Sequence, residues 1–187
     1  MTSKPDAQKG ARERILETAA ELFYREGVRA VGVGRIADQA RVAKMSLYYH
    51  FRSKDELVAA WLERRDAEWM GWLRDAVESR GGGIPAVFDA LRAWFDEPAF
   101  RGCAFINTQA ELGHCSDPAA AVISAHKREL RSYLAGLAAA DGLPEPERLA
   151  RGLLLLIEGA IVTAAIEGNA EAAADAREAA ERLIARV

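Results

Sequence analysis

The segment from Gly34 to Leu57 constrains the fold of this chain more than any other part of the sequence. Apolar residues recur at helical spacing on both sides of Arg41, and the break between the two sets is too short to be a loop. The first set is Ile36, Ala37 and Ala40, and the second set is Val42, Leu47 and Phe51. Two short helices joined by a tight turn, with a third helix starting near Lys54, form a helix-turn-helix pattern.

The second helix of this pattern, roughly from Lys44 to His50, is predicted to have a polar outer face. If Leu47 and Phe51 anchor it inward, five side chains are left to face solvent: Lys44, Ser46, Tyr48, Tyr49 and His50. Amines, hydroxyls and aromatic rings on one helix face suit the phosphates and base edges of nucleic acid. The segment is therefore a candidate DNA-binding surface.

The run from Val42 to Leu57 carries a more specific signal. It reads Val-Ala-Lys-Met-Ser-Leu-Tyr-Tyr-His-Phe-Arg-Ser-Lys-Asp-Glu-Leu and closely resembles the signature of the tetracycline-repressor (TetR) family of bacterial transcription regulators. The resemblance covers about the first 60 residues. Beyond them only helix content and length agree, because that family varies its second domain with its ligand. The resemblance implies a DNA-binding head, a ligand-binding body and a dimer.

The predicted DNA contacts fall into two groups. The end of the second helix nearest the turn reaches deepest into a major groove, so Lys44, Met45 and Ser46 are predicted to read base edges, with Tyr49 joining them. Phosphate contacts are implied by the resemblance for Tyr48, His50 and Lys54, and are predicted for Gly34 and Arg35 at the start of the preceding helix. A supporting structural role for Tyr48 and His50, and a filler role for Met45, stay open as alternatives.

Three residues depart from the family pattern. Arg41 stands where the family usually has the turn glycine, Ala43 stands where a Ser or Thr would cap the recognition helix, and Met45 replaces a small residue. A positive φ at Arg41 and a missing cap each cost about 1 kcal/mol, which is small against the stability of a domain. The fold is expected to survive these changes, whereas the preferred operator sequence is expected to differ.

Composition and spacing favour an all-α protein. Half of the 187 residues are apolar, only six are Pro, and Ala and Leu dominate a sequence that is poor in β-branched runs. We expect an N-terminal three-helix helix-turn-helix head on a larger C-terminal helical body. The DNA-binding domain is predicted at residues 1–53, and the effector-binding and dimerisation domain at residues 54–187.

The formal charge of −3 is unevenly distributed along the chain. Residues 1–55 contain eleven Lys or Arg and seven Asp or Glu, whereas the rest contains 14 basic and 21 acidic residues. A basic head on an acidic body is compatible with DNA binding, because phosphates need positive charge on one face only.

Helix-end signals and apolar periodicity predict the other helices. Gly27 ends the first, Ser53 to Glu56 is typical of a capping box that opens a long helix, and the Gly81 to Gly83 run breaks that helix. The predicted ranges are 9–26, 54–79, 84–95, a short helix within 103–113, 117–140, 145–167 and 172–186.

The helix predicted from Glu145 to Glu167 is apolar nearly all round, so packing one face is not enough to bury it. A homodimer is the natural inference, and the family that the chain resembles dimerises through its last two long helices. The predicted dimerisation residues are Leu153, Leu156, Gly159, Ala160, Val162, Ile166 and Leu183. The central helix of a monomeric bundle is the alternative.

Large aromatic residues are concentrated in the helices expected around a pocket, which favours a mostly apolar effector. The candidate ligand-binding residues are Trp61, Trp94, Cys103, Asn107 and His114, and ordinary core packing is the alternative for each. A metal or redox sensor built on Cys103, His114, Cys115 and His126 is disfavoured, because their spacing lacks the close pairs of a structural zinc site. No metal is predicted.

The sequence predicts a ligand-responsive repressor that binds a palindromic operator as a dimer and is released by a small effector. A DNA-binding regulator or architectural protein without an effector, and an activator, are the alternatives. The chain lacks a phosphate loop, a metal-binding His-Glu pair and a nucleophile beside a base, so no enzyme activity or cofactor is expected. Two cysteines, no signal-like start and an apolar run interrupted by Glu158 indicate a cytoplasmic protein without a membrane partner.

Overall fold

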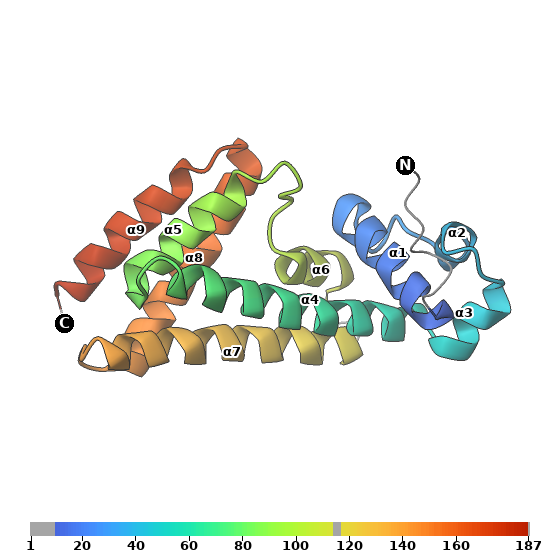
Figure 1. Ribbon diagram of the computed structural model, residues 1–187, viewed down its shortest axis with the longest axis horizontal. Coiled ribbons are helices and arrows are strands. Elements are labelled where there is room, and N and C mark those ends of the chain that lie inside the picture. Colours follow the sequence, from blue (N-terminus) through green and yellow to red (C-terminus); the bar gives the residue numbers. More distant parts are fainter. Residues whose placement is uncertain (1–9, 114–116, 187) are drawn as a thin grey trace. The chain divides into compact units, whose positions relative to one another are not determined.

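The structure is a computed structural model that describes residues 10–113 and 117–186. Every regular element among those residues is an α-helix, as the composition predicts. The chain forms two compact units (Figure 1). The head unit comprises residues Met1–Arg65 and Ala104–Ile123, and the body unit comprises Asp66–Cys103 and Ser124–Val187.

The head unit contains three short helices, α1 (Ala11–Glu26), α2 (Val33–Gln39) and α3 (Lys44–His50), which pack on one another. It also contains the start of α4 (Lys54–Glu78), all of α6 (Ala104–Leu112) and the start of α7 (Asp117–Ala140). Its core includes the fully buried side chains of Ile15, Leu22, Ile36, Leu47 and Phe51. The predicted helix-turn-helix is therefore confirmed, and α3 begins at Lys44 and ends at His50, as predicted from the sequence.

The turn between α2 and α3 is short, because α2 ends at Gln39 and α3 begins at Lys44. Arg41 adopts the predicted left-handed conformation, with φ of 53°. The next residue, Val42, donates its backbone N–H to the carbonyl of Ala37 at 3.0 Å. From α1, the Arg14 guanidinium donates to the carbonyl of Ala40 at 3.2 Å and so satisfies an acceptor at the end of α2. A tertiary contact thus holds a turn that lacks the glycine usual at this position.

The start of α4 carries the predicted cap. The Ser53 hydroxyl accepts the backbone N–H of Glu56 at 3.1 Å. The Glu56 carboxylate reaches back to the N–H of Arg52 at 2.8 Å, one residue before the position that a standard capping box uses. Two backbone donors at this helix end therefore have acceptors.

The body unit is built around three helices that lie side by side, α5 (Gly83–Phe95), α8 (Pro146–Glu167) and α9 (Glu171–Ile184) (Figure 1). The buried face of α9 consists of Ala172, Ala173, Ala176 and Ala180, and such small side chains allow close packing. A Cβ atom at Gly152 in α8 would lie 2.8 Å from a Leu183 methyl carbon. The close approach at Gly152 is therefore used by α9 of the same chain.

Among the described helices, α8 alone is long and apolar enough to cross a membrane by length and composition. Its inner face is buried in the body unit through seven residues: Leu149, Ala150, Leu153, Ile157, Ala160, Ile161 and Ala164. The core helix of a soluble protein has the same properties, so this finding is weak support for a membrane span.

Replacing Arg41 by Gly is expected to raise the free energy of unfolding by about 0.5–1 kcal/mol. Glycine removes the steric penalty of a positive φ, and this gain is only partly offset by the greater entropy of its unfolded chain. Urea unfolding of the full chain measures the change. Arg52→Gly is the matched control, because Arg52 is not at positive φ and this variant should lose stability. A loss of stability in Arg41→Gly would contradict the account of the turn.

Candidate nucleic-acid interface

Of the five α3 side chains expected to face solvent, Lys44, Tyr48 and Tyr49 are exposed, whereas Ser46 and His50 are half-buried. Met45, which was not among the five, is also exposed. Met45 and Tyr49 are 79% and 84% exposed. On the inner side, Leu47 is fully buried. Large apolar and aromatic side chains normally avoid such exposure, so the outer face of α3 has the composition of a contact surface rather than of a solvated one.

Tyr48 and His50, two of the three α3 residues with an open alternative role, are less exposed than Met45 and Tyr49. Tyr48 is 38% exposed and His50 is half-buried. The Tyr49 and His50 rings meet edge to face, with centroids 5.2 Å apart. The structure is thus compatible with phosphate contacts by Tyr48 and His50, which stay a prediction.

The start of α3 has no side-chain cap, as Ala43 predicts. The first turn closes instead through the backbone, because the N–H of Ser46 donates to the carbonyl of Ala43 at 2.8 Å. The exposed Lys44 is the first residue of the helix. Its position at the end nearest the turn is the one that base reading requires.

The start of α2 presents Arg35 in a charge cluster. Both Arg35 amino groups donate to the Glu26 carboxylate, one of them at 2.8 Å, and Arg25 donates to the same carboxylate at 2.6 Å. The hydrogen bonds from Arg35 and, to a smaller extent, from Arg25 lower the pKa of Glu26 to about 2. The pair with Glu26 also raises the pKa of Arg35. Arg35 is thus fixed in orientation and keeps donors that Glu26 does not use.

Lys54 is the first residue of α4 and is partly buried. Burial lowers the pKa of its ammonium, and the nearby carboxylates of Asp55 and Glu111 act in the opposite direction. Glu111 lies in α6, 57 positions further along the chain. Sequence spacing therefore gave no signal that this residue belongs to the surroundings of Lys54.

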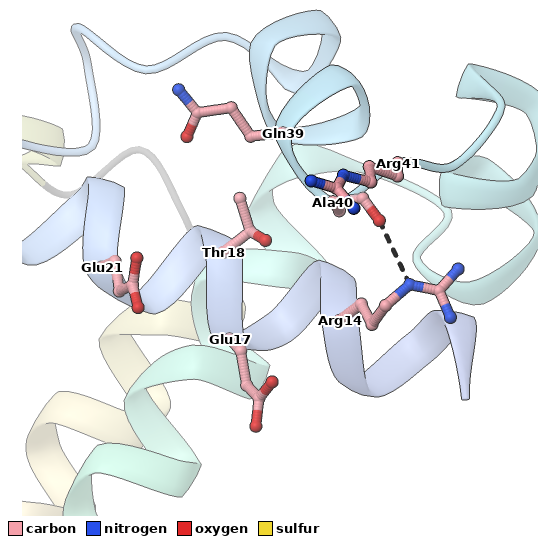
Figure 2. Close-up of a pocket in the computed structure, with 7 residues that line it drawn as sticks. All are labelled: Arg14, Glu17, Thr18, Glu21, Gln39, Ala40 and Arg41. Carbon is pink, nitrogen blue, oxygen red and sulfur yellow. Dashed lines mark hydrogen bonds between the residues drawn. The ribbon is translucent and has the colours of Figure 1, made fainter. Parts of the chain in front are cut away.

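Two arginines of α1 support the interface and were missed by the sequence analysis. The Arg12 guanidinium lies over the Phe51 ring, 5.1 Å from its centroid, and Arg14 binds the Ala40 carbonyl described above. A cavity of about 520 Å³ lies beside the latter contact (Figure 2). Its lining consists of Arg14, Glu17, Thr18, Glu21, Gln39, Ala40 and Arg41. None of these contacts has a local sequence signature.

The residues proposed for effector binding do not form one described cluster. Trp61 lies in the head unit and contacts Phe23, with ring centroids 5.4 Å apart, and Asn107 is an exposed residue of α6. Trp94 and Cys103 are buried residues of the body unit. His114 and Cys115 lie outside the described residues.

The body unit holds an aromatic cluster, defined here as Trp69, Trp72, Trp94 and His126. The Trp69 ring lies 5.6 Å from Trp94 and 5.5 Å from His126, measured between centroids. His126 Nδ1 donates to the Asp66 carboxylate at 2.7 Å, and burial lowers the pKa of His126. The Trp69 indole N–H is the one buried side-chain nitrogen or oxygen among the described residues that has no hydrogen-bond partner.

The predicted dimerisation residues divide between two sides of α8. Leu153 and Ala160 are buried within the body unit, and Leu156 is half-buried. Gly159, Val162 and Ile166 are exposed. Leu155, which the sequence analysis did not select, is 71% exposed and completes a stripe at spacings of four, three and four residues: Leu155, Gly159, Val162 and Ile166. Leu183 packs on Gly152 of its own chain.

Comparison with known proteins matches both units to one family. The family model described as "Bacterial regulatory proteins, tetR family" matches residues 15–61, and a tetracyclin repressor-like C-terminal domain matches residues 83–180. A TetR-family regulator from Streptomyces coelicolor has a solved structure that aligns with a TM-score of 0.83 and 30% identity over 95% of both chains.

Two curated relatives match over a shorter segment. The activator FasR of Mycolicibacterium smegmatis is 36% identical over 85 residues, which are 46% of this chain and 39% of FasR. The repressor KstR2 of Mycobacterium tuberculosis is 37% identical over 86 residues, which are 46% of this chain and 42% of KstR2. The matches thus span about two fifths of these relatives. Taken with the family models and the helix-turn-helix, they show that this chain belongs to the TetR family of DNA-binding transcriptional regulators, which are not enzymes.

Proposed function

We propose that this chain is a dimeric repressor that binds a palindromic operator and is released by a small, mostly apolar effector. The observation that carries the DNA-binding part is the outer face of α3, where Lys44, Met45 and Tyr49 are exposed above a buried Leu47. In this proposal Lys44, Met45, Ser46 and Tyr49 read base edges. Tyr48, His50, Lys54, Gly34 and Arg35 hold the phosphate backbone.

The proposed dimer forms through the stripe Leu155, Gly159, Val162 and Ile166 on α8. Its spacing of four, three and four residues keeps it on one side of the helix, and all four residues are exposed. Gly159 lets a second helix approach closely. A dimer places two copies of α3 about 34 Å apart, one turn of DNA, so that each reads one half-site of a palindrome.

The proposed effector site is the aromatic cluster of the body unit. The three indoles offer flat apolar surface to an effector. The buried Trp69 N–H has no hydrogen-bond acceptor, and the effector would supply one. Trp94 belongs to the cluster, so the proposal keeps it as a ligand-binding residue. The effector that fits this chemistry is a flat apolar molecule with a carbonyl-type oxygen.

The proposed route of release is α4, which begins in the head unit at Lys54 and carries Trp69 in the body unit. An effector beside Trp69 would shift this helix and change the separation of the two α3 helices in the dimer. A coupling of about 1–3 kcal/mol is enough to weaken operator binding 5- to 150-fold. We place the functional boundary between head and body at residues 53 and 54, and the protein in the cytoplasm.

Activation is the second candidate function, because the relative FasR is an activator whereas KstR2 is a repressor. The sign of regulation depends on where the operator lies relative to the promoter. Selection of bound sites from random DNA, followed by transcription of the neighbouring gene in vitro with and without the protein, tests the proposed function. Reduced transcription supports repression, increased transcription supports activation, and the absence of any selected site contradicts the DNA-reading face.

Lys44→Ala is expected to relax sequence preference, whereas Lys54→Ala is expected to weaken binding to every sequence. A base contact discriminates by about 1–3 kcal/mol, and one phosphate contact changes the salt slope by about 1. Titration of the selected operator and a random duplex at several salt concentrations measures both effects. If the two variants lower operator and random affinity equally, the assignment of reading and holding roles is wrong.

Ile166→Glu is expected to shift the protein from dimer to monomer, because it buries a charge in the proposed interface. Sedimentation velocity at micromolar concentration measures the change. Ala139→Glu in α7 is the control, since Ala139 is equally a solvent-exposed apolar residue. A dimer that withstands Ile166→Glu would refute the use of this stripe.

The effector site predicts a preference within a matched pair of flat molecules, 9-fluorenone and fluorene, which differ by one carbonyl. Wild-type protein should bind fluorenone about 2- to 10-fold more tightly, since one hydrogen bond contributes about 0.5–1.5 kcal/mol. Trp69→Phe keeps an aromatic ring without the donor and should abolish the preference, whereas Trp61→Phe should keep it. Calorimetric titration measures the affinities, and a preference that persists in Trp69→Phe would exclude the role of the indole N–H.

A further inference from the structure

The connection between α1 and α2 is bound by a residue from far along the chain. The Glu111 carboxylate in α6 accepts the backbone N–H of Arg29 at 2.7 Å. The two residues are 82 positions apart, and both belong to the head unit. An ionised acceptor makes this a charge-assisted hydrogen bond, which is stronger than a neutral one.

The backbone at Gly27 leaves space for this carboxylate. Gly27 has φ of 88°, a conformation that disfavours a side chain. A Cβ atom built there would lie 2.7 Å from one Glu111 oxygen and 3.0 Å from the other. Gly27 therefore serves two purposes, because it ends α1 and also admits Glu111 to the backbone of the connection.

The same connection leads directly to proposed DNA contacts. At its start, Glu26 binds Arg35 through the paired hydrogen bonds described above, and Arg35 lies in the first turn of α2. Val28 and Val31 fix its middle to the core, since they are 2% and 0% exposed. The Glu111 charge also acts on Lys54 at the start of α4. Glu111 thus acts on both segments that are proposed to hold phosphate.

We infer that Glu111 is a positioning residue for DNA binding, which holds the α1–α2 connection so that α2 presents Arg35 to phosphate. This inference rests on the DNA-binding face proposed above. Glu111 itself touches no DNA in this account. The contact between Glu111 and the Arg29 amide links α6 directly to the α1–α2 connection within the head unit, by a path that does not follow α4.

The negative charge of Glu111 should weaken DNA binding, whereas its hydrogen bond to Arg29 should strengthen it. Two substitutions can therefore distinguish the two contributions. A negative charge near phosphate repels DNA, so its removal alone should leave affinity equal or higher. Loss of the hydrogen bond frees the connection, so affinity for the operator should fall. Glu111→Gln removes the charge and keeps an acceptor oxygen, whereas Glu111→Ala removes both.

The test titrates operator duplex, selected from random DNA by the wild-type protein, into full-length wild type and both variants. Glu111→Ala should bind the operator on the order of tenfold more weakly, as expected for the loss of a charge-assisted hydrogen bond. Glu111→Gln should bind no more weakly than wild type. The salt slope should stay unchanged in both variants, because Arg35 still contacts phosphate in the bound state and Glu111→Ala adds only the cost of ordering the freed connection. Lys54→Ala, in contrast, removes a phosphate contact and should lower the slope.

Glu21→Ala is the control for loss of a negative charge, since Glu21 is an exposed carboxylate of the head unit, whereas Glu111 is half-buried. It should bind the operator no more weakly than wild type. Amide hydrogen exchange at Arg29 reports on the contact itself and should be on the order of tenfold faster in Glu111→Ala than in Glu111→Gln. This readout keeps the inference testable even if one variant is less stable.

Three outcomes would overturn the inference: equal operator affinity in Glu111→Ala and Glu111→Gln, equal Arg29 exchange in the two variants, or a changed salt slope in Glu111→Ala. Failure of the DNA-binding face looks different. In that case Lys44→Ala and Lys54→Ala would also leave DNA binding unchanged, whereas failure of the Glu111 inference alone leaves the effects of those two variants intact.

Discussion

The burial of Leu47 and Phe51 is the constraint on which the rest of the DNA-binding face depends. Leu47 is fully buried and Phe51 is 1% exposed, so α3 cannot rotate about its axis without removing one of them from the core. Burying one large apolar side chain stabilises the fold by about 1.5–3 kcal/mol relative to leaving it exposed, so a rotation that exposed Leu47 or Phe51 would be costly. Met45 and Tyr49 are exposed because this anchoring leaves them no other position.

The sequence predicts local structure well in this protein because its signals are local. Gly27, Ser53 and Gly82 are predicted helix ends or breaks, and the structure has helix ends within one residue of each. The positive φ at Arg41 is implied by the family resemblance, because Arg41 stands where the family usually has the turn glycine. These features depend on backbone sterics and on hydrogen bonds between residues a few positions apart, which a single sequence displays directly.

The tertiary contacts could not be predicted in the same way. An all-round apolar helix such as α8 does not reveal which side its own chain covers, so Leu155 was not selected although it is exposed. The contact between Glu111 and Arg29 joins a polar side chain to a backbone amide, and neither group has a periodicity that marks it. Pairings of this kind are fixed by the packed structure, which brings the Glu111 carboxylate to the Arg29 amide.

The inclusion of α6 in the head unit bears on whether the DNA-binding part of this chain is autonomous. A fragment cut after Arg65 would contain all three helices of the helix-turn-helix and would still lack the acceptor of the Arg29 amide. It would also keep a glycine at position 27 whose open side faces water instead of a carboxylate. The recognition motif is continuous in sequence, but the compact unit that contains it is built from two separate segments of the chain.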